Sequence, residues 1–404
     1  MRSGHLLSTP TKRTPRLWTV MNITYVSTYP PIRCGIANYT KSLARALLNT
    51  GPARVTVITE QSGQHCADAE LKVIPSFNRD GDYVESIMQH VCDSNPEIVH
   101  LQHDYSVYGF GQRFFNLIKK IRPDPIVTMH EVHTPETVDK ITYGAENLAG
   151  NHAQLGLLAK RIVVHSDTMK EWLIKYGVES ERVEVIPHGT PVLPRISKAE
   201  AKRRWGFSED ERVLLSIGFI RRSKNERLLV EVLPDLLREV PGLRLLLVGS
   251  LHPYSTSSDI EEAQARRLIV KRLRLEPYVR FVERYLDDDE LLYALGCADL
   301  IVFLHDKPYI EVSGALHLGI GAGKPIVATA VPRFEEVKRF SPETILMPGD
   351  KHRLVEVASR ILTDEGFAND LARRTLEYAE HTSWMNVAQD HYRLYWETLK
   401  AERS

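Results

Sequence analysis

Short apolar runs alternate with amphipathic helical patterns along nearly the whole chain, beginning at Met21. Most of these runs are apolar at consecutive positions, which is typical of strands that are buried on both faces of a sheet. Strands of this kind separated by helices predict parallel sheets of the doubly wound α/β type. The expected strands are 23–27, 55–59, 98–102, 126–129, 161–165, 183–186, 213–218, 245–248, 279–282, 300–303 and 326–328. The clearest helical patterns cover 37–48, 166–175 and 228–239.

The chain has 404 residues, which exceeds the usual size of a single hydrophobic core and predicts two domains. The pattern breaks over 187–200, where prolines and a glycine lie close together, as is typical of an interdomain linker. Residues 1–20 are basic, contain no acidic residue and are expected to form a disordered tail. Ligands of such folds bind beyond the carboxyl ends of the strands, so the cleft between the domains is the expected site. The expected division is a Rossmann-like domain over 21–190, a linker over 191–204 and a second Rossmann-like domain over 205–383.

The composition excludes several classes of protein. Lysine and arginine together number 52, as do aspartate and glutamate, so the net charge is zero. A general nucleic-acid-binding protein would need a basic surface, which this balance argues against. The four cysteines are scattered without a CxxC pair, which predicts reduced thiols in a cytoplasmic protein and neither a zinc site nor a disulfide framework. No apolar run is long enough to cross a bilayer.

The segment 313–329 predicts a polar turn, one helix, a Gly323-Lys324-Pro325 stop and a buried strand. A helix that begins at Ser313-Gly314 presents unpaired backbone N–H groups and the positive end of its dipole. Such an end favours an anion, and phosphate is a common one. Ordinary α/β crossovers also contain helices that end in a glycine, so this motif alone leaves both interpretations open.

Polar residues follow several of the predicted strands. Gly35, in the turn after the first strand, allows the backbone to approach a ligand at the start of the next helix. Gln102 and His103 end one strand, and His130 ends the next. A histidine in such a place can position hydroxyl groups or carry a proton, although a lone histidine is more often structural. The histidines near these strands have no spacing to acidic residues that matches a known metal site.

A cationic turn with Arg221, Arg222 and Lys224 follows the strand that ends at Gly218. Fixed cations can stabilise negative charge that develops on a leaving group. A solvated basic loop is the alternative interpretation of the same residues. Gly249 ends the following strand, where a glycine allows the backbone to approach a ligand closely.

Taken in order, these motifs resemble the landmarks of the retaining glycosyltransferases of family 4, from Met21 to Tyr395. The Ser-Gly-Ala-Leu segment at 313–316 is similar to the Ser-Gly-x-Leu helix of a bacterial and archaeal branch of that family. The resemblance implies a GT-B architecture, in which two Rossmann-like domains with parallel sheets face a central cleft. It also implies that the N-terminal domain binds the acceptor and is completed by a helix over 384–404. The C-terminal domain would then bind a nucleotide-sugar donor.

The resemblance implies roles for individual residues. The candidate catalytic residues are His130, Lys224 and Glu311. The donor and its diphosphate would be bound by Gly35, Arg221, Arg222, Lys224, Gly249, Ser313 and Gly314. The base would be contacted by Arg284 and Tyr285, and the sugar or the acceptor by Gln102, His103 and His130.

Two positions depart from the pattern of the family. Phe219 stands where an arginine usually follows the glycine, so Arg221 or Arg222 would have to supply the second cation. Many members of the family have two glutamates that hold the donor, and Leu318 stands at the second of these positions. The ribose must then be recognised by other groups. Glu311 lies one residue from the first of these positions and could serve in its place.

The implied activity is the retaining transfer of a hexosyl group from a UDP- or GDP-linked sugar to a sugar, small-molecule or lipid-linked acceptor, without a metal or cofactor. Phe219 and Leu318 motivate one alternative, a catalytically silent protein that binds sugar nucleotides or glycans. A phosphorylase or epimerase on the same fold is another. No nucleic-acid partner is expected, and membrane contact is expected to be peripheral at most. The residues that suggest such contact lie on or beside one helical segment and are Arg113, Lys119, Lys120 and Arg122.

Overall fold

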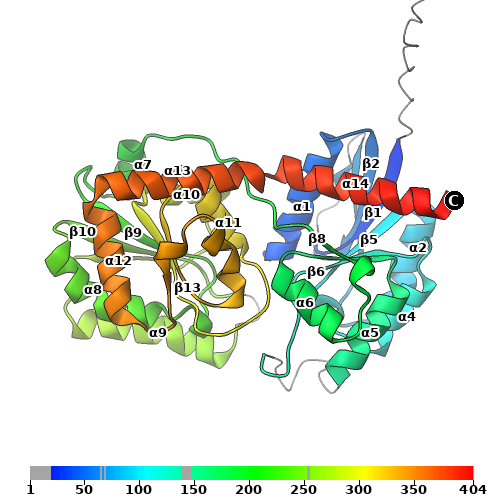
Figure 1. Ribbon diagram of the computed structural model, residues 1–404, viewed down its shortest axis with the longest axis horizontal. Helices are drawn as coiled ribbons and strands as arrows, with labels where there is room; N and C mark the ends of the chain where they lie inside the picture. The colour runs from blue at the N-terminus through cyan, green and yellow to red at the C-terminus, as the bar shows by residue number, and fades with distance from the viewer. Residues whose placement is uncertain (1–19, 64–65, 68–69, 138–146, 253–254, 404) are drawn as a thin grey trace, which may run out of the picture.

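The computed structural model describes residues 20–63, 66–67, 70–137, 147–252 and 255–403. The expected tail over 1–20 lies outside the described residues, apart from Val20. The described chain forms two α/β domains side by side, each built on its own sheet (Figure 1). The prediction of two Rossmann-like domains with parallel sheets is therefore confirmed.

The N-terminal sheet has the strand order β3-β4-β2-β1-β5-β6-β7-β8, and all its pairings are parallel except that of β3 with β4. Its strands are β1 (Met21–Val26), β2 (Ala53–Glu60), β3 (Cys66–Ala67), β4 (Leu71–Phe77), β5 (Ile98–His103), β6 (Ile126–Met129), β7 (Arg161–Val164) and β8 (Val183–Val185). The sequence did not predict β4, because Pro75 interrupts its pattern. Pro75 lies opposite Thr59 of β2, next to a register shift between Thr59 and Glu60, and such irregular positions accommodate proline.

Helices cover both faces of this sheet. Those on one face are α1 (Gly35–Leu48) and α14 (Trp384–Arg403). Those on the other are α2 (Val84–Ser94), α4 (Gln112–Lys120), α5 (Leu148–Leu158) and α6 (Asp167–Lys175), and α3 (Tyr105–Tyr108) is a short turn after β5. The C-terminal helix α14 therefore packs on the N-terminal domain, where the Tyr395 and Tyr25 hydroxyl groups form a hydrogen bond of 2.8 Å.

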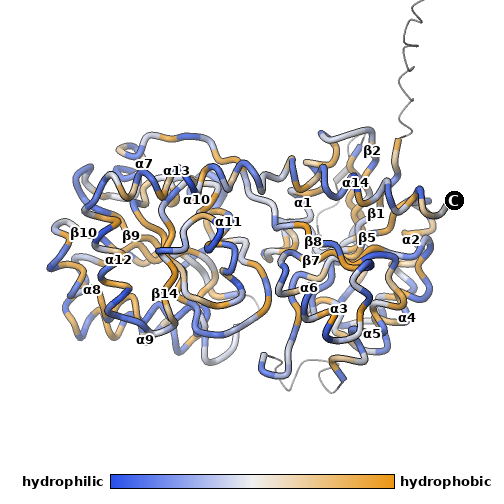
Figure 2. Tube along the Cα trace, in the orientation of Figure 1, coloured by the Kyte–Doolittle hydropathy of each residue, from blue (hydrophilic) through white to orange (hydrophobic). Residues whose placement is uncertain are grey.

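The C-terminal sheet has the order β11-β10-β9-β12-β13-β14, and all its pairings are parallel. Its strands are β9 (Arg212–Ile217), β10 (Leu243–Val248), β11 (Val279–Val282), β12 (Leu300–Phe303), β13 (Ile326–Thr329) and β14 (Ile345–Leu346). One face is covered by α7 (Lys198–Arg204), α10 (Asp288–Cys297), α11 (Gly314–Gly321) and the 3-10 segment η4 (Pro332–Arg339). The other is covered by α8 (Glu226–Glu239), α9 (Ser257–Arg272), α12 (Lys351–Thr363) and α13 (Glu365–His381). The apolar residues are concentrated on the central strands of both domains (Figure 2).

The chain passes between the domains twice, and the two passages lie side by side. Thr190 donates its N–H to the Thr382 carbonyl at 2.7 Å, and Trp384 donates to the Thr190 carbonyl at 3.2 Å. Gly189 is required at this crossing, because a Cβ there would lie 2.2 Å from the ring of Trp384. The helices α13 and α14 continue this connection across the top of both domains (Figure 1).

The loops that follow the strands of the two sheets meet across the cleft. Glu131, just after β6, forms an antiparallel bridge with Glu311, in the loop after β12. Val132 donates its N–H to the Ile310 carbonyl at 2.9 Å. These contacts place Glu131, which follows the candidate residue His130, beside the candidate residue Glu311.

Candidate functional site

The helix α11 begins as the sequence predicted. Ser313 is its N-cap, and its hydroxyl accepts a hydrogen bond from the Leu316 N–H at 3.2 Å. Ser313 is 8% exposed, so this cap is largely removed from water. Gly314 opens the helix, and the His188 imidazole lies 3.8 Å from the position that a Cβ would take there. The remaining N–H groups and the dipole at this end of α11 favour an anion.

Lys224 lies beside the first turn of α11, at the end of the 3-10 helix η3 (Arg222–Lys224). Gly218, with a φ of 118°, brings the two together: a Cβ on Gly218 would lie 3.4 Å from the Ala315 Cβ and 3.8 Å from Lys224 Nζ. The ammonium donates to the Gly218 carbonyl at 3.4 Å and to Glu226 Oε1 at 2.9 Å. We expected an open cleft around Lys224, but the residue is only 5% exposed because these groups enclose it.

The other cations of this turn are closer to solvent. Arg221 pairs with Asp259 at 3.6 Å, and the backbone N–H of Arg222 donates to the same carboxylate at 3.0 Å. The Arg222 side chain is exposed, as a solvated basic loop would have it. Of the three cations predicted from the sequence, only Lys224 is enclosed in the structure.

Gly249 has a structural reason to be a glycine. A Cβ at this position would lie 1.9 Å from the Gly218 carbonyl oxygen, so the two turns can approach only without a side chain. Its N–H donates to the Val282 carbonyl at 3.0 Å. Contact between the Gly249 backbone and a nucleotide stays a prediction, and this N–H is already used by β11.

On the N-terminal side, Gln102, His130 and His165 form a hydrogen-bonded row. His130 Nε2 lies 2.9 Å from Gln102 Oε1, and His130 Nδ1 lies 3.3 Å from His165 Nε2. His165 Nδ1 lies 2.9 Å from the Ile186 carbonyl oxygen and must therefore carry the proton of that bond. The edge of the His130 ring packs against Tyr39, with 4.7 Å between the ring centres.

This row can hold either of two protonation states. If both imidazoles are neutral, His130 donates through Nδ1 to His165, and the amide NH2 of Gln102 must turn toward His130 Nε2. If His130 is protonated, Nε2 donates to the Gln102 oxygen instead. Burial, followed by the neighbouring His165, lowers the pKa of His130 well below its usual value, so the neutral state is favoured.

His103 lies in the core rather than on the cleft surface. It has no exposed surface, its Nε2 donates to the Gly109 carbonyl at 3.0 Å, and Phe114 packs on its ring at 4.5 Å between centres. Burial lowers the pKa of His103 to about 4. A direct sugar contact by His103, as predicted, would require this packing to open. Gln102 is buried to the same degree, whereas His130, its hydrogen-bond partner, is partly exposed. His130 is therefore the better placed candidate contact, and a direct contact by Gln102 stays a prediction.

Glu311 has a partner that the sequence analysis missed. Its carboxylate is bound by the guanidinium of Arg333, from η4, and the two side chains are 24% and 18% exposed. Burial lowers the pKa of Arg333 to about 10, and the nearby Glu131 opposes this shift. Burial likewise raises the pKa of Glu131 to about 8, with Asp104 adding to the effect. The position of Arg333 just beyond the carboxyl end of β13 was the signal that could have identified it.

Tyr285, Arg284 and Gly35 lie at the far side of the cleft. The Tyr285 hydroxyl accepts from the Asn38 side chain at 3.4 Å, and the Arg33 guanidinium lies 5.1 Å from the ring centre, so Tyr285 bridges the two domains. The Arg284 guanidinium is bound by both oxygens of Glu290. A Cβ on Gly35 would meet open space, so this start of α1 is accessible.

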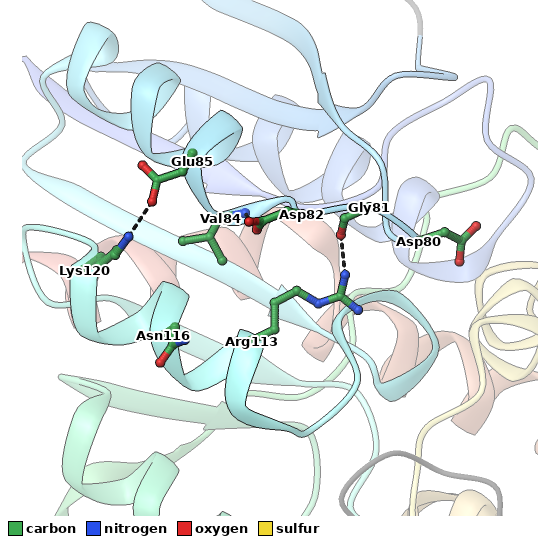
Figure 3. Close-up of a pocket in the computed structure, with 8 residues that line it drawn as sticks. All are labelled: Asp80, Gly81, Asp82, Val84, Glu85, Arg113, Asn116 and Lys120. Carbon is green, nitrogen blue, oxygen red and sulfur yellow. Dashed lines mark hydrogen bonds and ion pairs between the residues drawn. The ribbon is translucent and has the colours of Figure 1, made fainter.

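A surface cavity of about 520 Å³ lies between α2 and α4, away from these residues (Figure 3). Its lining carries charges of both signs: Lys120 pairs with Glu85, and Arg113 donates to the Gly81 carbonyl. This pairing also reduces the free positive charge on the basic helical segment noted in the sequence. The cavity therefore adds no evident part to the candidate site.

No group of three or more histidine, cysteine, aspartate or glutamate side chains among the described residues could hold a metal ion. None of the helices in the described ranges combines the length and the apolar composition that a membrane span needs.

Comparisons with known proteins agree with this arrangement. Residues 34–192 match the family Glycosyltransferase Family 4, and residues 197–381 match the family Glycosyl transferases group 1. A D-inositol 3-phosphate glycosyltransferase from Nocardioides sp. is 27% identical over 279 residues, which cover 65% of this chain and 60% of that protein. The chain thus spans less than two thirds of the length of this curated relative.

Two solved structures show the same fold. Sucrose-phosphate synthase from Thermosynechococcus elongatus has a TM-score of 0.76 at 19% identity, covering 94% of this chain and all of that one. HepE from Anabaena, crystallised with UDP-glucose, has a TM-score of 0.72 at 16% identity, with 94% and 100% covered. Together with the two family matches, the two facing Rossmann-like domains show that this chain belongs to glycosyltransferase family 4 and has the GT-B fold.

Proposed function

We propose that the chain is a retaining glycosyltransferase that moves a hexosyl group from a nucleotide-diphosphate sugar to a sugar, small-molecule or lipid-linked acceptor. The observation that carries this proposal is that Lys224 Nζ and Gly218 lie beside the first turn of α11. The Gly314 end of that helix meets His188, whose ring neighbours His165 in the His130 row. A buried cation beside a helix N-terminus is suited to a diphosphate. The UDP-glucose in the HepE crystal makes UDP the first nucleotide to test, with GDP second.

In this reaction the bond between the anomeric carbon and the diphosphate oxygen breaks, and the acceptor oxygen bonds to the same face of that carbon. The proton of the acceptor hydroxyl passes to the departing phosphate oxygen, so the protein needs no nucleophilic side chain. Lys224 and α11 stabilise the charge that develops on the leaving group. His130 and Glu311 orient hydroxyl groups, and Arg333 fixes the Glu311 carboxylate.

A donor-hydrolysis assay in EDTA tests the proposal. The wild-type protein should release nucleoside diphosphate from at least one UDP- or GDP-linked hexose, because fixed cations and a helix dipole replace a metal. Loss of activity in EDTA that one divalent ion restores would contradict metal independence. Binding of the sugar nucleotide without any release, with or without candidate acceptors, would support the silent regulator suggested by Phe219 and Leu318.

The alternatives on the same fold give other products. A phosphorylase would form sugar 1-phosphate only when inorganic phosphate is added, and an epimerase would return an altered sugar nucleotide. We further propose that any membrane contact is peripheral and reversible, since Lys120 and Arg113 are already engaged in the structure. Sedimentation with anionic vesicles should then fall at high salt, because each exposed basic group contributes only about 1 kcal/mol near such a surface.

A further inference from the structure

Lys224 and Glu226 form an ion pair inside the C-terminal domain. The 2.9 Å contact joins Lys224 Nζ to Glu226 Oε1, and the two side chains are 6% and 4% exposed. Asn225 lies between them with a φ of 52°, which asparagine tolerates better than most residues and which turns both neighbours inward. Glu226 is also the first residue of α8, where a carboxylate is favoured by the helix dipole.

A carboxylate paired with Lys224 alone would cancel the charge that a diphosphate needs. Glu226 is instead shared: its second oxygen contacts Arg266 of α9, and the Ser216 hydroxyl donates to Oε1 at 2.7 Å. Burial by itself would raise the pKa of Glu226, but Lys224 and Arg266 outweigh it and lower the pKa to about 2. One ionised carboxylate is therefore held between two buried cations.

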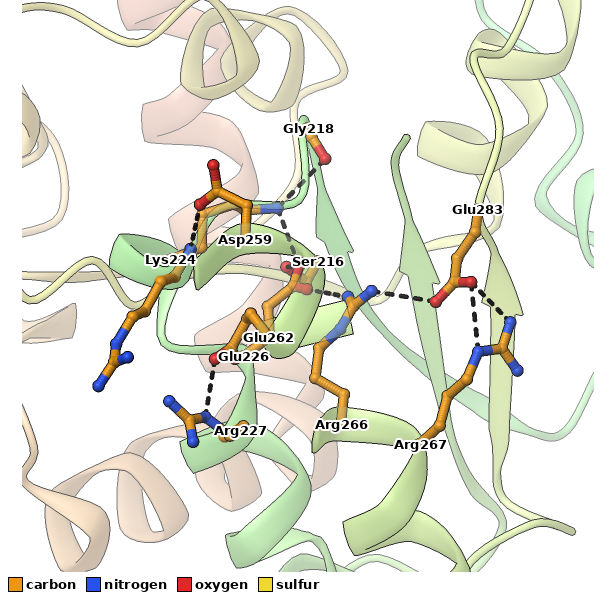
Figure 4. A network of polar contacts seen from close by, with 11 residues as sticks. Ser216, Gly218, Lys224, Glu226, Arg227, Asp259, Glu262, Arg266, Arg267 and Glu283 are labelled. Carbon is orange, nitrogen blue, oxygen red and sulfur yellow. Dashed lines mark hydrogen bonds and ion pairs between the residues drawn. The ribbon is translucent and has the colours of Figure 1, made fainter. Parts of the chain in front are cut away.

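The row of charges continues to the end of β11 (Figure 4). Arg266 donates to Glu283 Oε1 at 3.1 Å, and the exposed Arg267 contacts Glu283 Oε2 at 2.7 Å. Glu283 precedes Arg284 and Tyr285, the candidate base contacts. Because cations and anions alternate from Lys224 to Arg267, the row contains one more cation than anions and keeps a net positive charge.

The geometry also fixes the direction of the Lys224 ammonium. An ammonium has three N–H donors, and Glu226 and the Gly218 carbonyl accept two of them. Within the described residues, the third donor is the one that remains for a phosphate oxygen. A lysine with four rotatable side-chain bonds is otherwise a flexible point charge, so these two acceptors supply its orientation.

We propose that Glu226 is a positioning residue for Lys224, and that Arg266 is the second cation that keeps Glu226 from neutralising it. This inference rests on the proposed function, in which Lys224 binds the donor diphosphate. It predicts opposite effects from removing the two partners. Without Glu226, the site gains positive charge but loses orientation. Without Arg266, Lys224 keeps its orientation but loses net charge.

The test compares Glu226→Gln, Glu226→Asp and Arg266→Met with the wild type. It measures UDP and GDP binding by calorimetry, kcat and KM for the donor, and the Tm. Glu226→Gln should lower kcat by about tenfold or more without weakening nucleotide binding, and Glu226→Asp should restore part of kcat because it keeps the charge. Arg266→Met should weaken nucleotide binding by about tenfold, since charge attraction is lost. The matched control is Arg238→Met, an exposed arginine at the far end of α8 that pairs with Asp235 outside this row, and it should change binding by less than about twofold.

Loss of one buried partner can unfold the domain, and a double variant covers that case. Glu226→Gln combined with Arg266→Met removes both charges and should recover the Tm, yet kcat should stay low because the amide oxygen of glutamine holds the Lys224 ammonium less firmly than a carboxylate does. Recovery of kcat together with the Tm would overturn the inference and leave a purely structural pair. So would nucleotide affinities that move in the same direction in the two single variants. Lys224→Ala distinguishes a failure of this inference from a failure of the proposed function. Unchanged nucleotide binding in that variant would contradict the proposed function itself.

Discussion

The two walls of the cleft are built from different kinds of polar group. On the N-terminal wall, His130 and Gln102 belong to a row of neutral hydrogen-bonded groups whose imidazole pKa values are lowered by burial. On the C-terminal wall, Lys224 belongs to a row of buried ion pairs with Glu226 and Arg266. Both rows lie mostly in the interior, and the contacts that define each row are made within its own domain.

The difference fits the two halves of the proposed substrate. A hexose and its acceptor offer hydroxyl groups, which neutral donors and acceptors can orient with little cost in desolvation. A leaving diphosphate develops charge, which fixed cations in a water-poor site stabilise most strongly. The comparison implies that variants of the two walls should differ in what they lose.

The largest expected effect follows from removal of the Lys224 cation. Lys224→Ala should lower kcat/KM by about 10²–10³-fold, the usual cost of losing one preorganised group that stabilises transition-state charge. Steady-state kinetics on the purified variant would measure it. Arg238→Ala is the matched control, because Arg238 is an exposed arginine at the other end of α8 that pairs with Asp235. A folded Lys224→Ala variant with near-normal turnover would contradict the account of the C-terminal wall.

The second effect concerns the neutral wall. His130→Ala should lower kcat by about 10²-fold, the low end of the range for groups that position or carry a proton. His130 should show no titration near pH 6.5 in the pH profile of kcat, since burial keeps its pKa well below that value. His391→Gln serves as the buried-histidine control, because its Nδ1 bonds only the Val387 carbonyl within α14. An acid limb near pH 6.5 that disappears with His130 would show that the residue works in its charged form.

The third effect is on stability and its dependence on pH. Burial lowers the pKa of His152, His165 and His391 to about 4. Their unfolded forms bind protons near pH 6.5, so the stabilisation is complete above that pH and is lost as the pH falls toward 4. Each such histidine should remove up to about 1.4 kcal/mol per pH unit in this window.

The charged wall should respond at lower pH. Glu226, with a pKa of about 2, stabilises the fold above pH 4.5 and loses its effect only as the pH falls toward 2. His252 and His305 of the C-terminal domain also have lowered pKa values. Both domains should therefore lose stability as the pH falls, but the N-terminal domain should lose more. Hydrogen exchange at pH 7 and pH 5 should show the N-terminal domain losing protection first. Earlier loss in the C-terminal domain would reverse the comparison.

The smallest effect is expected where the walls touch at Tyr285. Tyr285→Phe removes the hydroxyl that meets Asn38 at 3.4 Å but keeps the ring under Arg33. A half-exposed hydrogen bond of this length should contribute less than about 1 kcal/mol, so the donor KM should change by less than about fivefold. A larger change would mean that the hydroxyl contacts the donor as well as Asn38.

The sequence predicted the fold because its strands are apolar on both faces and its breaks fall at prolines and glycines. It also predicted where α11 and α6 begin, and the structure shows that Ser313 and Ser166 cap these helices. The Ser166 side chain accepts from the Met169 N–H at 3.3 Å. The β4 strand was missed because Pro75 interrupts its pattern, and the structure accommodates this proline at a register shift against β2.

The partners of the site residues could not be predicted in the same way. Arg333 reaches Glu311, and Arg266 reaches Glu226, over separations in the chain that no local pattern encodes. His103 shows the reverse case, since a polar residue at a strand end was expected to face the cleft and instead packs under Phe114. Local sequence indicated which residues carry chemistry, whereas their enclosure depends on tertiary packing.

We propose above that the C-terminal wall recognises a diphosphate through Lys224 and the start of α11. Calorimetry in EDTA with UDP and UMP, and with GDP and GMP, can test this recognition in the wild type and in Lys224→Ala. We expect the wild type to bind one diphosphate more tightly than its monophosphate. Lys224→Ala should remove most of that preference, while binding of the monophosphate changes little. An unchanged preference in Lys224→Ala, or a preference that appears only with a divalent metal, would contradict this proposal.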